Sequence, residues 1–138
     1  MILVTGGAGF IGANYVLQEL GRMTSTLVNL DKLTYAGNLQ TLKSISEKPN
    51  YHFYQGDIGD RALVAQILEK YQPEAVINFA AESHVDRSIH GPGDFIQTNI
   101  VGPFIYLNRF EPIMKNWVMV KRISFGSCTS QRMRSTAP

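Results

Sequence analysis

The sequence predicts an α/β fold in which helices cover both faces of a doubly wound parallel sheet. Short, continuous apolar segments alternate along the chain with longer segments of helical period. That alternation is typical of parallel strands that are buried on both faces. Right-handed crossovers between such strands place helices on the two sides of the sheet. About four strands are expected, followed by a poorly ordered tail, so the predicted sheet is incomplete.

Each element is predicted from its own apolar pattern. The strands are expected at Ile2–Thr5, Leu27–Leu30, Tyr51–Gln55 and Ala75–Phe79. The helices are expected at Phe10–Leu20, Leu39–Ile45, Arg61–Tyr71 and Asp94–Leu107. Pro103 falls inside the last of these, where a proline costs about 3 kcal/mol. Past Leu107 the pattern decays, and Val118–Ile123 is the remaining strand candidate.

Composition narrows the class of protein. The 138 residues are 44% hydrophobic and 17% charged, which is typical of one globular domain. No apolar run is long enough for a membrane span, and the N-terminus has no basic, signal-like region. Cys128 is the single cysteine, which excludes an internal disulfide and favours the reducing cytoplasm.

The charge is divided between two parts of the chain. Residues 1–107 carry seven basic and ten acidic side chains, whereas residues 108–138 carry six basic and one acidic. The first part is predicted to be the N-terminal portion of a nucleotide-binding domain, and the second an atypical basic tail. Nucleic-acid binding by the tail is not expected.

A glycine-rich turn joins the first strand to the first helix. Gly6, Gly9 and Gly12 are spaced as in a phosphate-binding turn, and Gly7 supplies a second, overlapping pattern. Such glycines permit a tight turn, close approach of a diphosphate, and packing of helix on strand. The N–H groups of Phe10 and Ile11 would then face the phosphates. The alternative is an ordinary strand-to-helix turn.

The ends of the next strands carry further candidate cofactor residues. Asp31 follows Gly12 by 19 residues and ends strand two, where a carboxylate binds an adenosine ribose. This Rossmann-like arrangement predicts a dinucleotide, and the acid favours NAD over NADP, although the neighbouring Lys32 weakens that preference. Asp57 and Ile58 would contact the adenine, or Asp57 would form only an Asx turn. Phe79-Ala80-Ala81 would lie against the ribose on the nicotinamide side. The alternative is that these residues only pack against the rest of the protein.

Three strings carry a family resemblance. They are LVTGGAGFIG at Leu3–Gly12, DKLTYAGN at Asp31–Asn38 and AAESHVDRS at Ala80–Ser88. The first resembles the extended short-chain dehydrogenase/reductases at large. The second and third together resemble the bacterial dTDP-glucose 4,6-dehydratase family, over residues 1–107.

The resemblance implies an activity and a set of site residues. The family is a homodimeric lyase that converts dTDP-glucose to dTDP-4-keto-6-deoxy-glucose, a rhamnose precursor, with NAD taking and returning a hydride. It implies no metal, nucleic acid or membrane partner. The implied NAD-binding residues are Gly6, Gly9, Phe10, Ile11, Gly12, Asp31, Lys32, Leu33, Thr34, Asp57, Ile58, Phe79, Ala80, Ala81, Ser83 and Thr98. The implied substrate residues are Ser83, His84, Asp86 and Arg87. As alternatives, His84 is a hydrogen-bonded loop residue, and Asp86 and Arg87 pair with each other.

The family's catalytic strings are absent from this sequence. It has no Thr-Asp-Glu, and no tyrosine is followed four places later by lysine, so no catalytic residue is assigned. We interpret residues 108–138 as the product of a frameshift near residues 107–110. Permitted codons for Ser127–Pro138, read one frame away, give Leu-His-Val-Ser-Thr-Asp-Glu-Val-Tyr-Gly-Thr, which resembles the missing string. The basic excess of the tail would then be accidental.

Three functions remain open at this point. The first is a dehydratase fragment that binds NAD without turnover. The second is a stand-alone NAD-binding or regulatory module, or a fragment of a related nucleotide-sugar epimerase or dehydratase. The third is an enzyme whose missing groups come from another chain.

Overall fold

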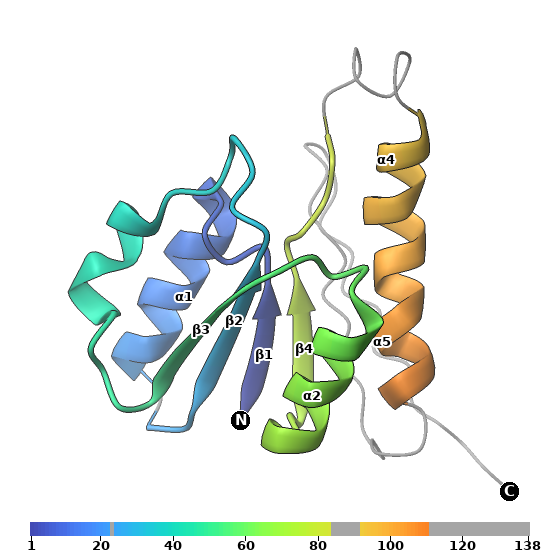
Figure 1. Ribbon diagram of the computed structural model, residues 1–138. Coiled ribbons are helices and arrows are strands. Elements are labelled where there is room, and N and C mark those ends of the chain that lie inside the picture. The colour runs from blue at the N-terminus through green and yellow to red at the C-terminus, as the bar shows by residue number, and fades with distance from the viewer. Residues whose placement is uncertain (23, 84–91, 111–138) are drawn as a thin grey trace, which may run out of the picture.

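Four parallel strands form the centre of the fold in the computed structural model, which describes residues 1–22, 24–83 and 92–110. They are β1 (Ile2–Thr5), β2 (Leu27–Asp31), β3 (Tyr51–Gln55) and β4 (Ala75–Asn78). Their spatial order is β3-β2-β1-β4, so the chain moves outward on one side of β1 and then crosses to its other side (Figure 1). The predicted doubly wound sheet is confirmed.

Register places alternate side chains of each strand into two separate cores. Ile2 pairs with Leu27 on one side and with Ala75 on the other. Leu3 and Val28 belong to one core, whereas their neighbours Val4 and Leu27 belong to the other. A strand that is buried on both faces needs apolar residues at successive positions, which explains the continuous apolar segments.

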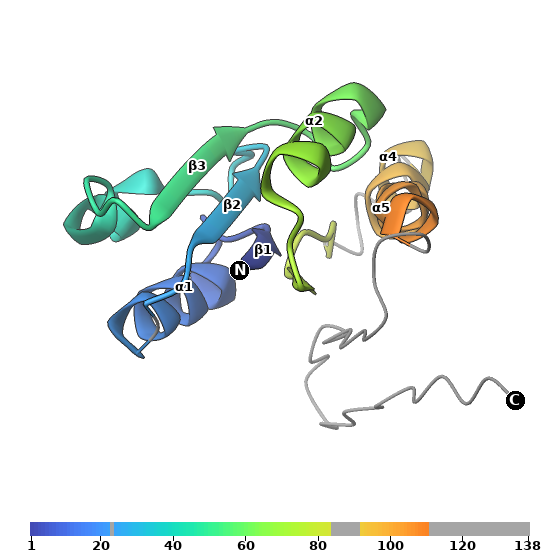
Figure 2. The ribbon, with the colours of Figure 1, turned by 90° about the horizontal axis from the view of Figure 1, so that it is seen from below.

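Helix α1 (Phe10–Arg22) and the 3₁₀ helix η1 (Leu39–Ile45) cover one face of the sheet. Figure 2 shows them on the opposite side from α2 (Arg61–Tyr71). Val16 and Leu20 of α1 are buried four residues apart, at the spacing of one helical face. The prediction of a helix at residues 39–45 is confirmed, with tighter 3₁₀ geometry; Asn38 caps it by accepting from the Gln40 N–H.

Helix α2 covers the other face and has a defined start and end. The Asp60 side chain caps it by accepting from the N–H groups of Ala62 and Leu63. Gln72 ends the helix in the left-handed conformation, at a φ of 43°. Pro73 follows and cannot continue the helix. These local signals explain why the predicted bounds of α2 match the observed ones.

The last helical region is built of three joined segments. They are α4 (Pro92–Ile96), the π-helical segment η2 (Gln97–Val101) and α5 (Gly102–Phe110). The wider turn of η2 lets the Gly102 N–H donate to the carbonyl of Gln97. Pro103, which has no N–H, therefore follows a register change and lies in the first turn of α5, where a proline is tolerated. The predicted helix is confirmed, and the expected cost of Pro103 is avoided.

Several boundaries differ from the prediction by one to three residues. β2 ends at Asp31 instead of Leu30, α1 ends at Arg22 instead of Leu20, and the last helical region runs from Pro92 to Phe110. β4 ends at Asn78, because Phe79 already turns toward the loop while its N–H still donates to the carbonyl of Thr5. The strand candidate at residues 118–123 and the expected disorder of the tail fall outside the described residues. Within the described part, no helix has the length and apolarity that a membrane crossing needs.

Candidate cofactor-binding site

A pocket of about 320 Å³ opens at the carboxyl ends of the four strands. It lies where the strand order reverses at β1, which is where open α/β sheets bind their ligands. Its volume is within the range of small-molecule sites. The lining residues that the sequence predicted are Gly6, Gly9, Asp31, Lys32, Thr34, Asp57, Ile58, Phe79, Ala80, Ala81, Ser83 and Thr98.

Two glycines of the turn are required by close contacts with other parts of the backbone. Gly6 has a φ of 71°, and a Cβ there would lie 2.3 Å from the backbone nitrogen of Ala80. A Cβ on Gly12 would lie 2.2 Å from the carbonyl oxygen of Gly6. These close approaches bring the turn against the end of β4 and the start of α1 against the turn.

Gly9 is different, because a Cβ there would have only ordinary van der Waals contacts. A Cβ on Gly9 would meet nothing closer than the Gly6 oxygen at 3.5 Å, and the residue lines the pocket. Gly9 has no side chain to cap α1, and the described residues provide no hydrogen bond to the N–H groups of Phe10 and Ile11. The positive end of the α1 dipole is therefore available to an anion beside Gly9.

The Asp31 carboxylate is held by the backbone at the end of β2. Its Oδ2 accepts from the Ala8 N–H at 2.8 Å, and its Oδ1 accepts from the Leu33 N–H at 2.8 Å. The residue is 8% exposed yet still lines the pocket. Each carboxylate oxygen keeps a second lone pair, so the group is positioned in advance to accept a ligand hydroxyl.

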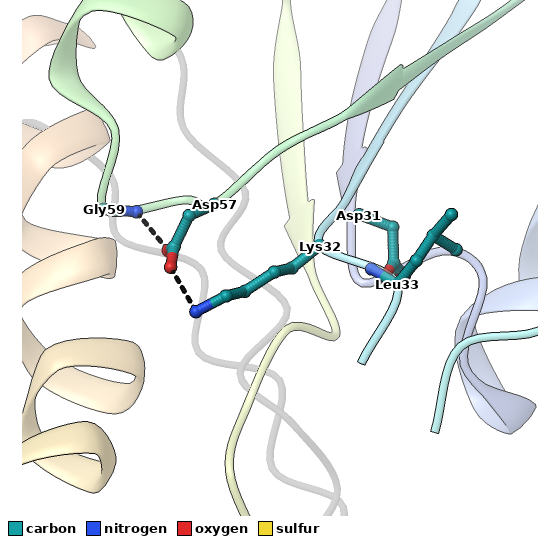
Figure 3. A network of polar contacts seen from close by, with 5 residues as sticks. All are labelled: Asp31, Lys32, Leu33, Asp57 and Gly59. Atoms are coloured by element: carbon teal, nitrogen blue, oxygen red, sulfur yellow. Dashed lines mark hydrogen bonds and ion pairs between the residues drawn. The ribbon is translucent and has the colours of Figure 1, made fainter. Parts of the chain in front are cut away.

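Lys32 and Asp57 form an ion pair across the pocket, 2.7 Å between Nζ and Oδ2. Figure 3 shows the Lys32 side chain extending away from Asp31 toward the loop that carries Asp57 and Gly59. Burial opposes ionisation of Asp57, but the Lys32 ammonium and the Gly59 N–H outweigh it and lower its pKa. The hydrogen bond to Asp57 raises the pKa of Lys32.

This pair predicts a pH dependence of stability. A carboxyl whose pKa is lowered by folding contributes stability above its ordinary pKa of 3.8 and loses it as the pH falls through the folded value. We expect wild type to be more stable than Asp57→Asn at neutral pH, and the difference to shrink in acid. Urea unfolding of both proteins across this range measures it. A difference that stays constant well below pH 3.8 would contradict the assignment.

Asn99 forms a clamp on the segment after β4, and no pattern in the sequence indicated it. The Asn99 Oδ1 accepts from the Glu82 N–H at 2.9 Å, and its Nδ2 donates to the Glu82 carbonyl at 2.8 Å. Glu82 in turn accepts from the Tyr35 hydroxyl at 3.0 Å. Segments from β2, β4 and η2 thus meet around the pocket.

Replacing Asn99 with aspartate should loosen this clamp. The carboxylate keeps the acceptor but cannot donate to the Glu82 carbonyl, which leaves two acceptors facing each other. We expect a loss of roughly 1–3 kcal/mol in the free energy of unfolding, measured by urea denaturation. Asn108→Asp on the exposed part of α5 is the matched control, and equal losses in the two variants would refute the clamp.

Four of the predicted site residues are described by the structure but do not line the pocket. Phe10 and Ile11, at the start of α1, are 86% and 47% exposed. Gly12 packs on the turn, and Leu33 packs against the core between α1 and the sheet. His84, Asp86 and Arg87 fall outside the described residues. Pocket residues that the sequence did not indicate are Leu30, Tyr35, Ala36, Gly37, Gly56, Glu82, Asp94 and Gln97. Within the described residues, no cluster of three potential metal ligands occurs.

Comparison with known families shows to which family the chain belongs. The family model described as GDP-mannose 4,6 dehydratase matches residues 3–131. The chain belongs to this GDP-mannose 4,6-dehydratase family. The match extends past residue 107, and the predicted division of the chain at that residue stays a prediction.

Curated relatives within the family share one name. The dTDP-glucose 4,6-dehydratase of Xanthomonas campestris pv. campestris is 55% identical over 123 residues, which are 89% of this chain and 35% of that protein. The Escherichia coli enzyme of the same name is 50% identical over 85% of this chain and 32% of that protein. The resemblance found in the three strings is confirmed. This chain spans about a third of the length of these relatives.

Solved structures of other proteins share the fold. A dTDP-glucose 4,6-dehydratase of Streptomyces venezuelae, crystallised with NAD, has a TM-score of 0.77 and 37% identity over 96% of this chain and 45% of that one. The Bacillus anthracis enzyme in complex with NAD has a TM-score of 0.73 and 34% identity over 98% of this chain and 44% of that one. A UDP-glucose 4-epimerase of Thermotoga maritima has a TM-score of 0.74 and 30% identity over 86% of this chain and 36% of that one.

Proposed function

We propose that the pocket binds NAD as part of a dTDP-glucose 4,6-dehydratase. The observation that carries this proposal is the position of Gly9 in the pocket lining, beside N–H groups at the start of α1 that have no partner among the described residues. A diphosphate needs such a combination of close backbone approach and free donors. The dehydratases of two other bacteria that were crystallised with NAD support it.

The other strand ends fit the remaining parts of NAD. The preset carboxylate of Asp31 would accept from the hydroxyls of the adenosine ribose, and its charge would oppose a 2′-phosphate. Asp57 and Ile58 would bracket the adenine. Phe79, Ala80 and Ala81 would lie against the second ribose, with Ser83 and Thr98 at the same end. When bound, NAD supplies a hydride acceptor, and these residues hold and orient it.

For the whole protein we propose conversion of dTDP-glucose to dTDP-4-keto-6-deoxy-glucose in the cytoplasm. The 138 residues lack the Thr-Asp-Glu and Tyr-x-x-x-Lys strings that the resemblance requires. We therefore expect this chain by itself to bind NAD without turnover. Ser83, His84, Asp86 and Arg87 would contribute to the substrate side. A 4-epimerase is the second candidate, supported by the epimerase with a similar fold.

Titration calorimetry of the purified chain with NAD⁺ tests the proposal. We expect one binding site per chain and no 4-keto sugar when dTDP-glucose is added. Absence of heat from NAD⁺ binding, with the fold intact by circular dichroism, would refute the cofactor site. Formation of 4-keto sugar by this chain would refute the expected lack of turnover. Formation of an epimerised sugar from a UDP-linked substrate would favour the second candidate.

We further propose that residues 108–138 are read out of frame. The altered charge balance and the string recovered from Ser127–Pro138 support this proposal. Sequencing the gene across the codons for residues 107–110 tests it. A single inserted or deleted base that restores the family's string is the expected result, and an intact frame there would refute it.

A further inference from the structure

The Lys32–Asp57 pair bears on which dinucleotide the pocket accepts. Lys32 is the one lysine or arginine among the described pocket residues, and it directly follows the ribose-side carboxylate Asp31. A lysine at this position is a potential partner for the 2′-phosphate of NADP, because an ammonium binds phosphate as a point charge. The direction of the Lys32 side chain therefore affects the choice between NAD and NADP.

The position of Asp57 does not depend on Lys32. The Asp57 Oδ1 accepts from the Gly59 N–H at 2.7 Å, within the loop that joins β3 to α2. This loop is also anchored by Gly56, where a Cβ would lie 2.1 Å from the Leu63 side chain. The lysine side chain, by contrast, is 59% exposed and has a long flexible stem. The Asp57 carboxylate is thus fixed by its own loop, and it determines where the Lys32 ammonium lies.

We propose that Asp57 is a selectivity residue that holds the Lys32 ammonium away from the adenosine ribose and so maintains the preference for NAD over NADP. Asp31 repels a 2′-phosphate directly, and Asp57 withdraws the nearest described cation that would offset this repulsion. Figure 3 shows the Asp31 and Asp57 carboxylates on opposite sides of the Lys32 backbone, with the Lys32 side chain paired with Asp57. The inference rests on the proposed NAD site.

The test measures the ratio of NADP⁺ to NAD⁺ affinity by calorimetry at low ionic strength. The full chain is compared with Asp57→Asn, Lys32→Met and the double variant. We expect Asp57→Asn to raise this ratio roughly twofold to fivefold, and added salt to reduce the gain. Any effect of the substitution on a contact between Asp57 and the adenine cancels in this ratio, because both cofactors contain that base. In the double variant the gain should disappear, because it requires the freed ammonium.

Asp60→Asn is the matched control. It removes the same charge from the same loop, and asparagine caps a helix as well as aspartate does. Its ratio should equal that of wild type. An unchanged ratio in Asp57→Asn, or a gain that persists in the double variant or appears in Asp60→Asn, would overturn the selectivity role while leaving the NAD site intact. Failure of wild type to bind NAD⁺ would overturn both.

Discussion

Gly6→Ala is expected to destabilise the protein more than any other single methyl addition in the glycine turn. At a φ of 71°, alanine adopts the left-handed conformation at a cost of roughly 1–2 kcal/mol. Its Cβ would also lie 2.3 Å from the Ala80 nitrogen, and forced displacement of packed backbone costs roughly 1–3 kcal/mol. The same Cβ incurs both costs. Urea denaturation monitored by circular dichroism measures the sum.

Gly21→Ala supplies the control for this prediction. Gly21 lies near the end of α1, and a Cβ there meets nothing within 4 Å. Alanine at that position should stabilise the helix by roughly 0.5–1 kcal/mol. If Gly6→Ala and Gly21→Ala unfolded at the same urea concentration, the close contact between the turn and Ala80 would be disproved.

Gly9→Ala is expected to have the opposite profile, with the fold retained and binding lost. The new Cβ would have ordinary contacts, 3.5 Å from the Gly6 oxygen and 4.0 Å from the Ala36 oxygen. It would project into the pocket at the point where the diphosphate must approach the start of α1. We expect NAD⁺ affinity to fall at least tenfold, which corresponds to about 1.4 kcal/mol.

Calorimetry with NAD⁺ and urea denaturation on the same sample distinguish these two effects. Gly21→Ala is again the matched variant, and it should bind NAD⁺ like wild type because it lies outside the pocket lining. Wild-type affinity in Gly9→Ala would mean that the diphosphate does not pass this residue. A large loss of stability instead would mean that Gly9 serves the fold and not a ligand.

Local sequence was enough to predict most of the elements. The strands are short apolar runs because each is buried on both faces, as Leu3 and Val4 are in separate cores. The bounds of α2 were predictable because Asp60 and Pro73 act within one turn of its ends. The glycine turn is local in part, because Gly12 packs against Gly6, whereas Gly6 packs against Ala80, which is distant in the sequence.

Contacts between distant segments were not predictable in this way. Asn99 and Glu82 are 17 residues apart, and nothing in either segment indicates that the Asn99 side chain bonds both the backbone N–H and the backbone carbonyl of Glu82. Pro103 looked costly because helical period alone does not reveal the π-helical segment that precedes it. Tertiary packing favours the π-helical geometry of that segment, since Gly102 lies against Ile58.

The sequence by itself determined the order of strands and helices, the phosphate-binding turn and the carboxylate at the end of β2, because each follows from spacing along the chain. The tertiary structure alone decided that Asp31 is fixed by the N–H groups of Ala8 and Leu33 and that Lys32 turns toward Asp57. The physical reason is that the direction of a charged side chain depends on the nearest opposite charge in space. That charge is 25 residues away in the sequence and becomes a neighbour only when β2 and β3 pair in register.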